Sequence, residues 1–419
     1  MENKKLPEVR FEEFSGDWKE SKFFDLYKIT SGYAFKMSDY SKTGITIING
    51  ESIQHNKIES NNFKYLPENF KEKYSQILLQ TGDIVIGLNR PITNGLLKIA
   101  RIPRELSGSI LYQRAGKIEY KQRISHDFSF VLLSKEILKF TLKEAVGSDQ
   151  PFISTTKLSE WDFKVPVENE EQEKIGYFFK QLDDTIVLHQ QELDRLKQTK
   201  QGFLQKMFPK EGQTVPELRF PGFAGDWARS KLDSIVNRVR SYSLSREVET
   251  IENTGYKYIH YGDIHTKVAD KINESSNLPN IIGGEYELLN KGDLVLADAS
   301  EDYQGVATPA VITIDVPYKL VAGLHTIALR PKHVDSLFLY YLINSPIFRK
   351  YGYKVGTGMK VFGISVTNLL KFESMFPQLQ EQTKIGSFFK QLDDTIALHQ
   401  RELDVLKETK KAFLQKMFI

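Results

Sequence analysis

The sequence predicts an α+β protein made of two similar halves, each a globular domain followed by one long helix. The first observation behind this prediction is a repeat, because residues 174–208 and residues 384–418 differ at only 7 positions. The second is the short β-branched segments that precede each copy, such as "GDIVIG" and "GDLVLA", which are typical of strands. The third is the heptad spacing of apolar residues inside the repeat. We therefore expect two pseudo-symmetric domains separated by two long helices that pack as an antiparallel coiled coil.

The segments outside the repeat predict the order of the domains. "LPEVRFEEFSGDW" is answered 209 residues later by "VPELRFPGFAGDW", and we name these stretches the lead-in segments. The expected order is a lead-in segment at 1–18, a first domain at 19–165, a central helix at 166–208, a linker with the second lead-in segment at 209–227, a second domain at 228–375 and a C-terminal helix at 376–419. Each domain should contain one substantial helix, at 130–146 and at 336–352, the second interrupted or started at Pro346. The first lead-in segment is expected to lie beside the C-terminal helix and close a pseudo-circular arrangement.

Composition excludes several classes of protein. The 419 residues include no cysteine, which rules out disulfides, Cys-ligated zinc, iron–sulfur clusters and thiol catalysis. The N-terminus lacks the apolar core of a signal peptide, and no apolar run approaches the ~20 residues that cross a bilayer. We expect a cytoplasmic protein with no membrane partner.

The apolar positions of the two long helices advance by four and three residues and define a seam. The seam residues are Ile175, Phe179, Leu182, Ile186, Leu193, Leu196, Ile385, Phe389, Leu392, Ile396, Leu403 and Leu406. We expect Phe179 to lie against its counterpart Phe389, and Leu182 and Ile186 against theirs. His189 and His399 also fall on the seam, where a core or register role is favoured over a metal site because no third ligand is evident.

Two acidic pairs stand outside this seam, Asp183–Asp184 and Asp393–Asp394. Adjacent positions of a helix point about 100° apart, so the two carboxylates of a pair do not readily serve one substrate. We expect all four side chains to be solvated or to face a docking partner.

A search for catalytic motifs finds none that would make this chain an enzyme. The sequence has no P-loop, no Gly-x-Gly-x-x-Gly after a strand, no His-Glu-x-x-His, no Gly-x-Ser-x-Gly and no consecutive prolines. "IEYK" at 118–121 resembles the Glu-x-Lys end of a nuclease site but lacks an upstream acidic partner. We predict no catalytic residue, no metal and no cofactor on this chain.

Polar and basic loops of the two domains are the candidate binding residues. The loops 87–95 and 147–157 of the first domain correspond to 297–305 and 355–363 of the second, and their side-chain types are those that read base edges in a DNA major groove. The first domain carries a net charge of +6 and the second +1, which permits a polyanionic partner without demanding one. The candidate residues are Asn89, Arg90, Thr93, Asn94, Ser148, Gln150, Ser154, Lys157, Asp298, Ser300, Tyr303, Gln304 and Lys360.

With its two different domains, each followed by the motif "KIGxFFKQLDDTI…QKMF", the chain resembles the specificity subunit of type I restriction–modification systems. This resemblance implies that each domain is a target recognition domain that reads one half of a split double-stranded DNA sequence. It implies that the paired helices fix the gap between the halves and dock two modification (methyltransferase) subunits, which in turn bring restriction (translocase and nuclease) subunits. S-adenosylmethionine, ATP and Mg²⁺ would be bound by these partners, and the specificity subunit itself would be non-catalytic.

A non-catalytic coiled-coil scaffold that binds proteins at both ends is the alternative. A scaffold would explain the long helices and the missing catalytic motifs. It would not explain why the two domains share a skeleton and differ in their loops. The sequence leaves open which DNA sequence is read, how long the gap is, which loops contact bases and which domain reads which half.

Overall fold

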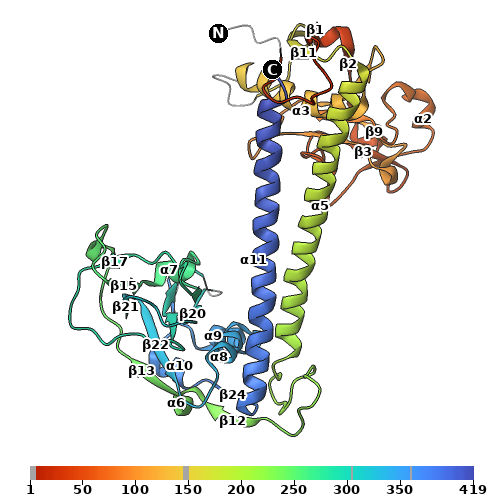
Figure 1. Ribbon diagram of the computed structural model, residues 1–419. Helices are drawn as coiled ribbons and strands as arrows, with labels where there is room; N and C mark the ends of the chain where they lie inside the picture. Colours follow the sequence, from red (N-terminus) through yellow and green to blue (C-terminus); the bar gives the residue numbers. More distant parts are fainter. Residues whose placement is uncertain (1–5, 145–150, 303–304, 359–360) are drawn as a thin grey trace. The chain divides into compact units, whose positions relative to one another are not determined.

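The computed structural model describes residues 6–144, 151–302, 305–358 and 361–419, which form two compact units (Figure 1). Unit 1 consists of residues 1–189 and 402–419, and unit 2 of residues 190–401. Both long helices therefore contribute one part to each unit. Across the described residues, no helix combines the length and apolarity that crossing a membrane requires.

Unit 1 is built around a four-stranded antiparallel sheet and a buried helix. The sheet has the order β2 (Tyr27–Ser31), β10 (Ala115–Tyr120), β5 (Ile84–Gly87), β8 (Ile99–Arg101). The smaller sheets are β4 (Tyr65–Leu66), β3 (Ile45–Ile48) and β9 (Ile110–Leu111); β1 (Lys19–Lys22) with β11 (Asp162–Val165); and the hairpin β6 (Ile92–Thr93) and β7 (Leu96–Leu97). The helices are α1 (Phe23–Leu26), α2 (Phe70–Lys73), α3 (His126–Glu144), α4 (Thr155–Ser159) and the first part of α5 (Asn169–Lys206).

Unit 2 repeats this plan, and its main sheet has one more strand than that of unit 1. Its main sheet has the order β13 (Val236–Val239), β22 (Thr326–Pro331), β18 (Leu294–Ala297), β20 (Pro309–Ile312), β16 (Lys271–Ile272). The smaller sheets are β14 (Glu249–Thr250), β17 (Asn280–Ile281), β15 (Tyr256–Ile259) and β21 (Lys319–Ala322); β12 (Ala228–Lys231) with β24 (Glu373–Phe376); and β19 (Ala299–Ser300) with β23 (Phe362–Gly363). The helices are α6 (Leu232–Ile235), α7 (Tyr261–His265), α8 (Ser336–Asn344), α9 (Pro346–Val355) and α10 (Val366–Leu370). The last part of α5 and the first part of α11 (Leu379–Lys416) complete unit 2, and the end of α11 belongs to unit 1. The predicted helix at 336–352 is thus interrupted before Pro346, as expected.

The strand that follows Gly-Asp in "GDIVIG" or "GDLVLA" is apolar throughout because it is buried on both faces. In unit 1, Ile84 and Ile86 belong to the core that contains α3, whereas Val85 belongs to the core shared with β3 and β9. In unit 2, Leu294 and Val295 divide in the same way between two cores. Alternation of side chains along a strand explains this division.

In each unit, the parts of the two long helices run antiparallel. In unit 1 the ring centroids of Phe178 and Phe413 lie 5.0 Å apart. In unit 2 Phe203 and Phe388 are separated by 5.1 Å. Every seam residue is buried or half-buried, as a seam requires.

The expected pairing of Phe179 with Phe389 is wrong. Phe179 packs against Phe418, with ring centroids 5.9 Å apart, and Phe389 packs against Phe208 at 6.1 Å. In each unit the start of one long helix lies beside the end of the other, so Phe179 and Phe389, which both stand near helix starts, belong to different units and do not pair.

The lead-in segments tie the helices together in both units. Arg10 forms a two-point ion pair with Glu171 at 2.6 and 2.7 Å, and Arg219 forms the same pair with Glu381 at the same distances. The Val9 N–H donates to the carbonyl of Lys416 at 3.0 Å, which confirms that the first lead-in segment lies beside the C-terminal helix. The second lead-in segment makes the equivalent bond, from Leu218 N–H to Lys206 O at 2.9 Å.

Candidate nucleic-acid interface

In the first domain, the structure brings the two predicted loops together at one edge. The backbone of Asn89 bridges to Phe152, the Arg90 N–H donates to Pro151 O at 2.9 Å, and the Ile153 N–H donates to Leu88 O at 2.9 Å. Residues that are 61 to 65 positions apart in the chain therefore form one surface.

The tip of this surface is a tight hairpin. Thr93, the last residue of β6, and Asn94, which follows it, are both exposed. Asn94 has a φ of 51°, as required in the two-residue turn that it forms with Gly95. Arg90 is also exposed and left-handed, with a φ of 47°. Ser154 is partly committed locally, because its Oγ accepts from Lys157 N at 3.3 Å and caps α4. The ammonium group of Lys157 pairs with Glu144 in an exposed position.

The second domain repeats this juxtaposition. Ala299 and Ser300 of β19 pair with Phe362 and Gly363 of β23, and the Ile364 N–H donates to Asp298 O at 2.9 Å. Asp298 is half-buried and its Oδ1 lies 3.1 Å from His325 Nδ1.

Ser300 is a correction to the predicted set. Its residue is only 7% exposed, and its Oγ accepts from the Asp302 N–H at 3.3 Å. Its side chain thus organises the loop from within and is not available to read a base. The candidate residues Ser148, Gln150, Tyr303, Gln304 and Lys360 lie outside the described residues.

Sequence reasoning missed a third segment at each edge. In unit 1 it is the turn 112–114 between β9 and β10, whose Arg114 O accepts from the Leu88 N–H at 2.8 Å. In unit 2 it is the turn 323–325 between β21 and β22, whose His325 O accepts from the Asp298 N–H at 3.0 Å. Neither turn ends in the Gly or Asn that would have predicted a left-handed residue, so the sequence gave little signal.

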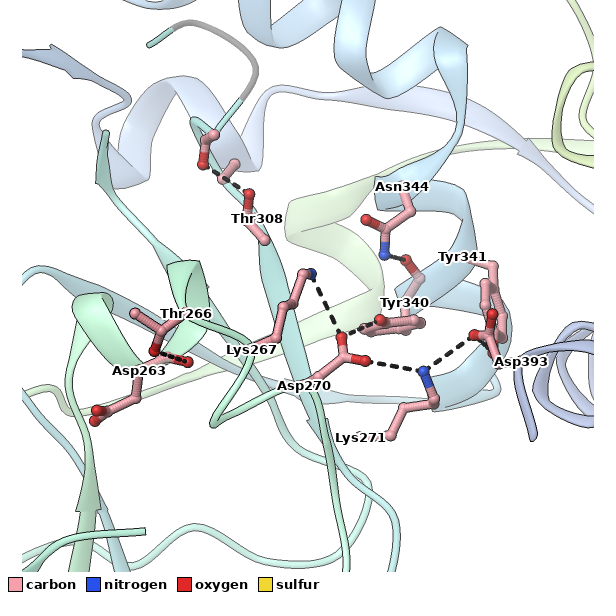
Figure 2. A network of polar contacts seen from close by, with 12 residues as sticks. Asp263, Thr266, Lys267, Asp270, Lys271, Thr308, Tyr340, Tyr341, Asn344 and Asp393 are labelled. Atoms are coloured by element: carbon pink, nitrogen blue, oxygen red, sulfur yellow. Dashed lines mark hydrogen bonds and ion pairs between the residues drawn. The ribbon is translucent and has the colours of Figure 1, made fainter. Parts of the chain in front are cut away.

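The acidic pairs of the long helices behave differently from expectation. Asp393 is not outward-facing, since its side chain is 11% exposed and accepts from Tyr341 Oη at 2.8 Å and Lys271 Nζ at 3.0 Å. Lys200 of α5 lies 2.5 Å from the other carboxylate oxygen. Figure 2 shows Lys271 placed between Asp393 and Asp270, so that β16, α8 and α11 meet at one network of charges.

Electrostatics support this network. Burial alone would raise the pKa of Asp393, but the ammonium groups of Lys271 and Lys200 outweigh it and hold the pKa below its ordinary value. Burial would likewise lower the pKa of Lys271, and the carboxylates of Asp270 and Asp393 raise it instead. The carboxylate of Asp393 and the ammonium group of Lys271 therefore stay charged at neutral pH and fasten the second domain to the helix.

Asp183 is the equivalent residue of unit 1 and is also engaged within the chain. Its carboxylate pairs with Lys410 Nζ at 2.5 Å, and Asn56 Nδ2 is 3.4 Å away. The expectation that Asp183 and Asp393 face a partner is therefore wrong, because each carboxylate forms an ion pair with a lysine of the neighbouring helix. Asp184 and Asp394 are exposed, each beside a lysine one turn earlier, and their docking role stays a prediction.

With this geometry established, comparison with known proteins decides the family. Residues 15–198 and 224–408 each match the family described as "Type I restriction modification DNA specificity domain". The chain belongs to this family. It carries two copies of the specificity domain, and these coincide with the two repeated plans of sheet and helix.

Two named relatives match this chain in sequence, one over about half of its length and the other over nearly all of it. The MjaVIII specificity subunit of a type I restriction enzyme from Methanocaldococcus jannaschii is 33% identical over 203 residues, which cover 48% of this chain and 47% of the relative. The MjaX specificity subunit from the same organism is 24% identical over 433 residues, covering 99% of this chain and 95% of the relative. The chain thus matches about half the length of the first relative and nearly all of the second.

Solved structures show the same fold. The S subunit of a type I restriction–modification system from M. genitalium superposes with a TM-score of 0.61 at 13% identity and covers 99% of both chains. A chain from a structural study of complex assembly in the type I system gives a TM-score of 0.54 at 18% identity, covering 96% of this chain and 97% of that one.

Proposed function

We propose that this chain is the non-catalytic, sequence-specific DNA-recognition subunit of a type I restriction–modification complex. Each specificity domain would read one half of a bipartite double-stranded DNA site. The observation that carries this proposal is the contrast between the two halves: the helices and their anchors are nearly identical, whereas the loops at the equivalent edges differ. Two nearly identical helices can each bind one copy of the same partner. Two domains whose edge loops differ can each recognise a different half of the DNA site.

The antiparallel helix pairs would then set the gap between the half-sites and dock two modification subunits. Exposed Asp184 and Asp394 are the candidate docking residues, since they occupy the same position in both copies and their side chains face away from the seam. S-adenosylmethionine, ATP and Mg²⁺ would be held by the modification and restriction subunits. Much of the grip on DNA phosphates would also come from these partners, because the chain carries a net charge of only +3.

Methylation mapping tests this proposal. The chain is co-expressed with the modification subunit of its source strain in a host without restriction systems, and genomic methylation is sequenced. We expect methylated adenines at one split motif. Replacing residues 19–165 by the corresponding domain of a relative should change one half of the motif and leave the other intact, and replacing 228–375 serves as the reciprocal control.

The gap is tested separately by inserting one helical turn beside Leu193 together with one turn beside Leu403, so that the antiparallel pairing is kept. The permitted gap should lengthen while both half-sites stay the same. Methylation at no defined motif, or a complex that does not form with a modification subunit, would favour the scaffold alternative.

A further inference from the structure

We infer that Arg114 and His325, which end equivalent turns of the two domains, are base-reading residues of the DNA interface. This inference rests on the proposed function and adds residues to it that the loops predicted from sequence do not contain. Arg114 precedes β10, and His325 precedes β22, the matching strand of the second sheet. Each accepts, through its carbonyl, from the first residue after the repeated "GDIVIG" or "GDLVLA" strand.

The backbone of each turn is fixed from several sides. In unit 1, Tyr112 N–H donates to Ile48 O at 2.9 Å and Gln113 N–H donates to Tyr33 O at 3.0 Å. A Cβ added to Gly32 would lie 2.3 Å from Tyr112 O, so the neighbouring segment can approach only as glycine. A turn held in this way presents its last side chain from a rigid base, as a specific contact requires.

In the second domain, backbone hydrogen bonds to neighbouring segments also hold the turn 323–325 in place. Gly323 N–H donates to Ile259 O at 2.9 Å and Leu324 N–H donates to Leu244 O at 3.2 Å. A Cβ on Gly323 would lie 2.6 Å from the ring of Tyr258, so here the glycine belongs to the turn itself.

Both terminal residues of the turns are left-handed and exposed. Arg114 has a φ of 67° and His325 a φ of 54°, a region that disfavours residues with a Cβ. Glycine would adopt this conformation without strain, yet both positions carry a large polar side chain that points to solvent. Left-handed residues other than glycine concentrate at functional sites because the side chain is needed there.

Arg114 and His325 lie beside the loops that the sequence predicts to contact DNA. In unit 1, Arg90 and Asn94 belong to the loop that directly follows Leu88, the partner of Arg114. In unit 2, the ring of His325 is held between Asp298 and the edge of Tyr261, with ring centroids 5.3 Å apart. The interface of each domain therefore consists of three segments, and the turn is hydrogen-bonded to the loop that follows the repeated strand, which in turn is bonded to the third segment.

The two side chains suit different bases. The guanidinium of Arg114 can donate two hydrogen bonds to the N7 and O6 acceptors of guanine. The carboxylate of Asp298 only accepts, so His325 Nδ1 donates to it. In the tautomer whose single N–H is at Nδ1, Nε2 is an acceptor that suits the amino group of adenine or cytosine. Equivalent positions with different chemistry are what two unequal half-sites need.

The experiment replaces each residue by glycine in the complete chain, complexed with modification subunits. Arg114→Gly and His325→Gly remove the side chain and relieve the left-handed strain, so the thermal midpoint should be unchanged or higher. Methylation of a plasmid carrying the native motif should fall by about 10-fold or more, within the range of one good base contact. Arg114→Gly should relax one guanine of one half-site, and His325→Gly one position of the other.

His333→Gly is the matched control. His333 is also an exposed histidine with a φ of 54°, but it follows β22, whereas His325 precedes this strand. Its replacement should leave both the methylation rate and the motif unchanged. If the wild-type complex methylates a split motif and both Arg114→Gly and His325→Gly leave that motif unchanged, this inference is overturned but the proposed function is not. A wild-type complex that methylates no motif would instead overturn the proposed function.

Discussion

Asp393 should contribute more to stability than its counterpart Asp183, although both stand in identical helical sequence. The substitution Asp393→Ala removes the acceptor shared by Lys200, Lys271 and Tyr341. Breaking a buried ion pair by removing one partner costs about 3–5 kcal/mol. Because a quarter of the Lys200 side chain is already exposed, its ammonium group can turn to water, and we expect the lower end of this range, about 3 kcal/mol.

The control Asp183→Ala should cost about 1 kcal/mol, because Asp183 loses one lysine and one long contact to exposed Asn56. For domains of this size, 1 kcal/mol corresponds to about 2–4 °C in the thermal midpoint. The midpoint of unit 2 should therefore fall by about 6–12 °C in Asp393→Ala, and that of unit 1 by about 2–4 °C in Asp183→Ala.

Scanning calorimetry measures these midpoints, and hydrogen exchange of peptides from β16 and α8 assigns the change to unit 2. The double variant with Lys271→Met should lose less than the sum of the single losses, since both remove the same ion pair. Equal losses in the two alanine variants would refute the reasoning, as would additive losses in the double variant.

Three further outcomes are expected. Gly176→Ala should destabilise unit 1 by about 2 kcal/mol or more in denaturant unfolding, because its Cβ would lie 2.4 Å from Phe128 N, whereas Gly202→Ala in the same helix meets nothing within 4 Å and should stabilise by up to about 1 kcal/mol. Arg219→Lys should cost about 2 kcal/mol of unfolding free energy, because lysine cannot reproduce the two-point contact; a midpoint equal to wild type would contradict this. The pKa of Lys271 is raised above 10.5, so the midpoint difference between wild type and Lys271→Met should be full below pH 10.5 and shrink as pH rises beyond it; a difference independent of pH would contradict the assignment.

The architecture was predictable because its signals are local or repeated. Heptad spacing identified the buried side chains of the long helices, and internal repetition identified two equivalent domains. Pro346 marked the break between α8 and α9 because a proline lacks the N–H of a helix interior.

The candidate interface was only partly predictable because its remaining determinants are distant in sequence. Asp393 lies outside the heptad seam and was expected to be solvated or to face a partner, because its ion-pair partner Lys271 comes from a strand 122 residues earlier in the chain. Arg114 was missed because its left-handed conformation is imposed by backbone bonds to residues 33, 48 and 88 and not by the turn sequence itself. Ser300 was included because polarity alone does not reveal that a hydroxyl points inward.

One set of contacts between each long helix and its domain uses main-chain atoms on the domain side, beside the side-chain contacts of Asp183 and Asp393. Gln172 Oε1 accepts from the Ser125 N–H, and Gln382 Oε1 from the Asp335 N–H, at 3.3 and 2.9 Å. The backbone of Phe128 likewise fills the space left by the missing side chain of Gly176. Every amino acid except proline supplies the same N–H group, so these main-chain contacts make few demands on the residues that provide them. The loops at the edge of each domain can therefore change in sequence without changing these main-chain contacts, so that domains with different loops can attach to the same helix in the same way.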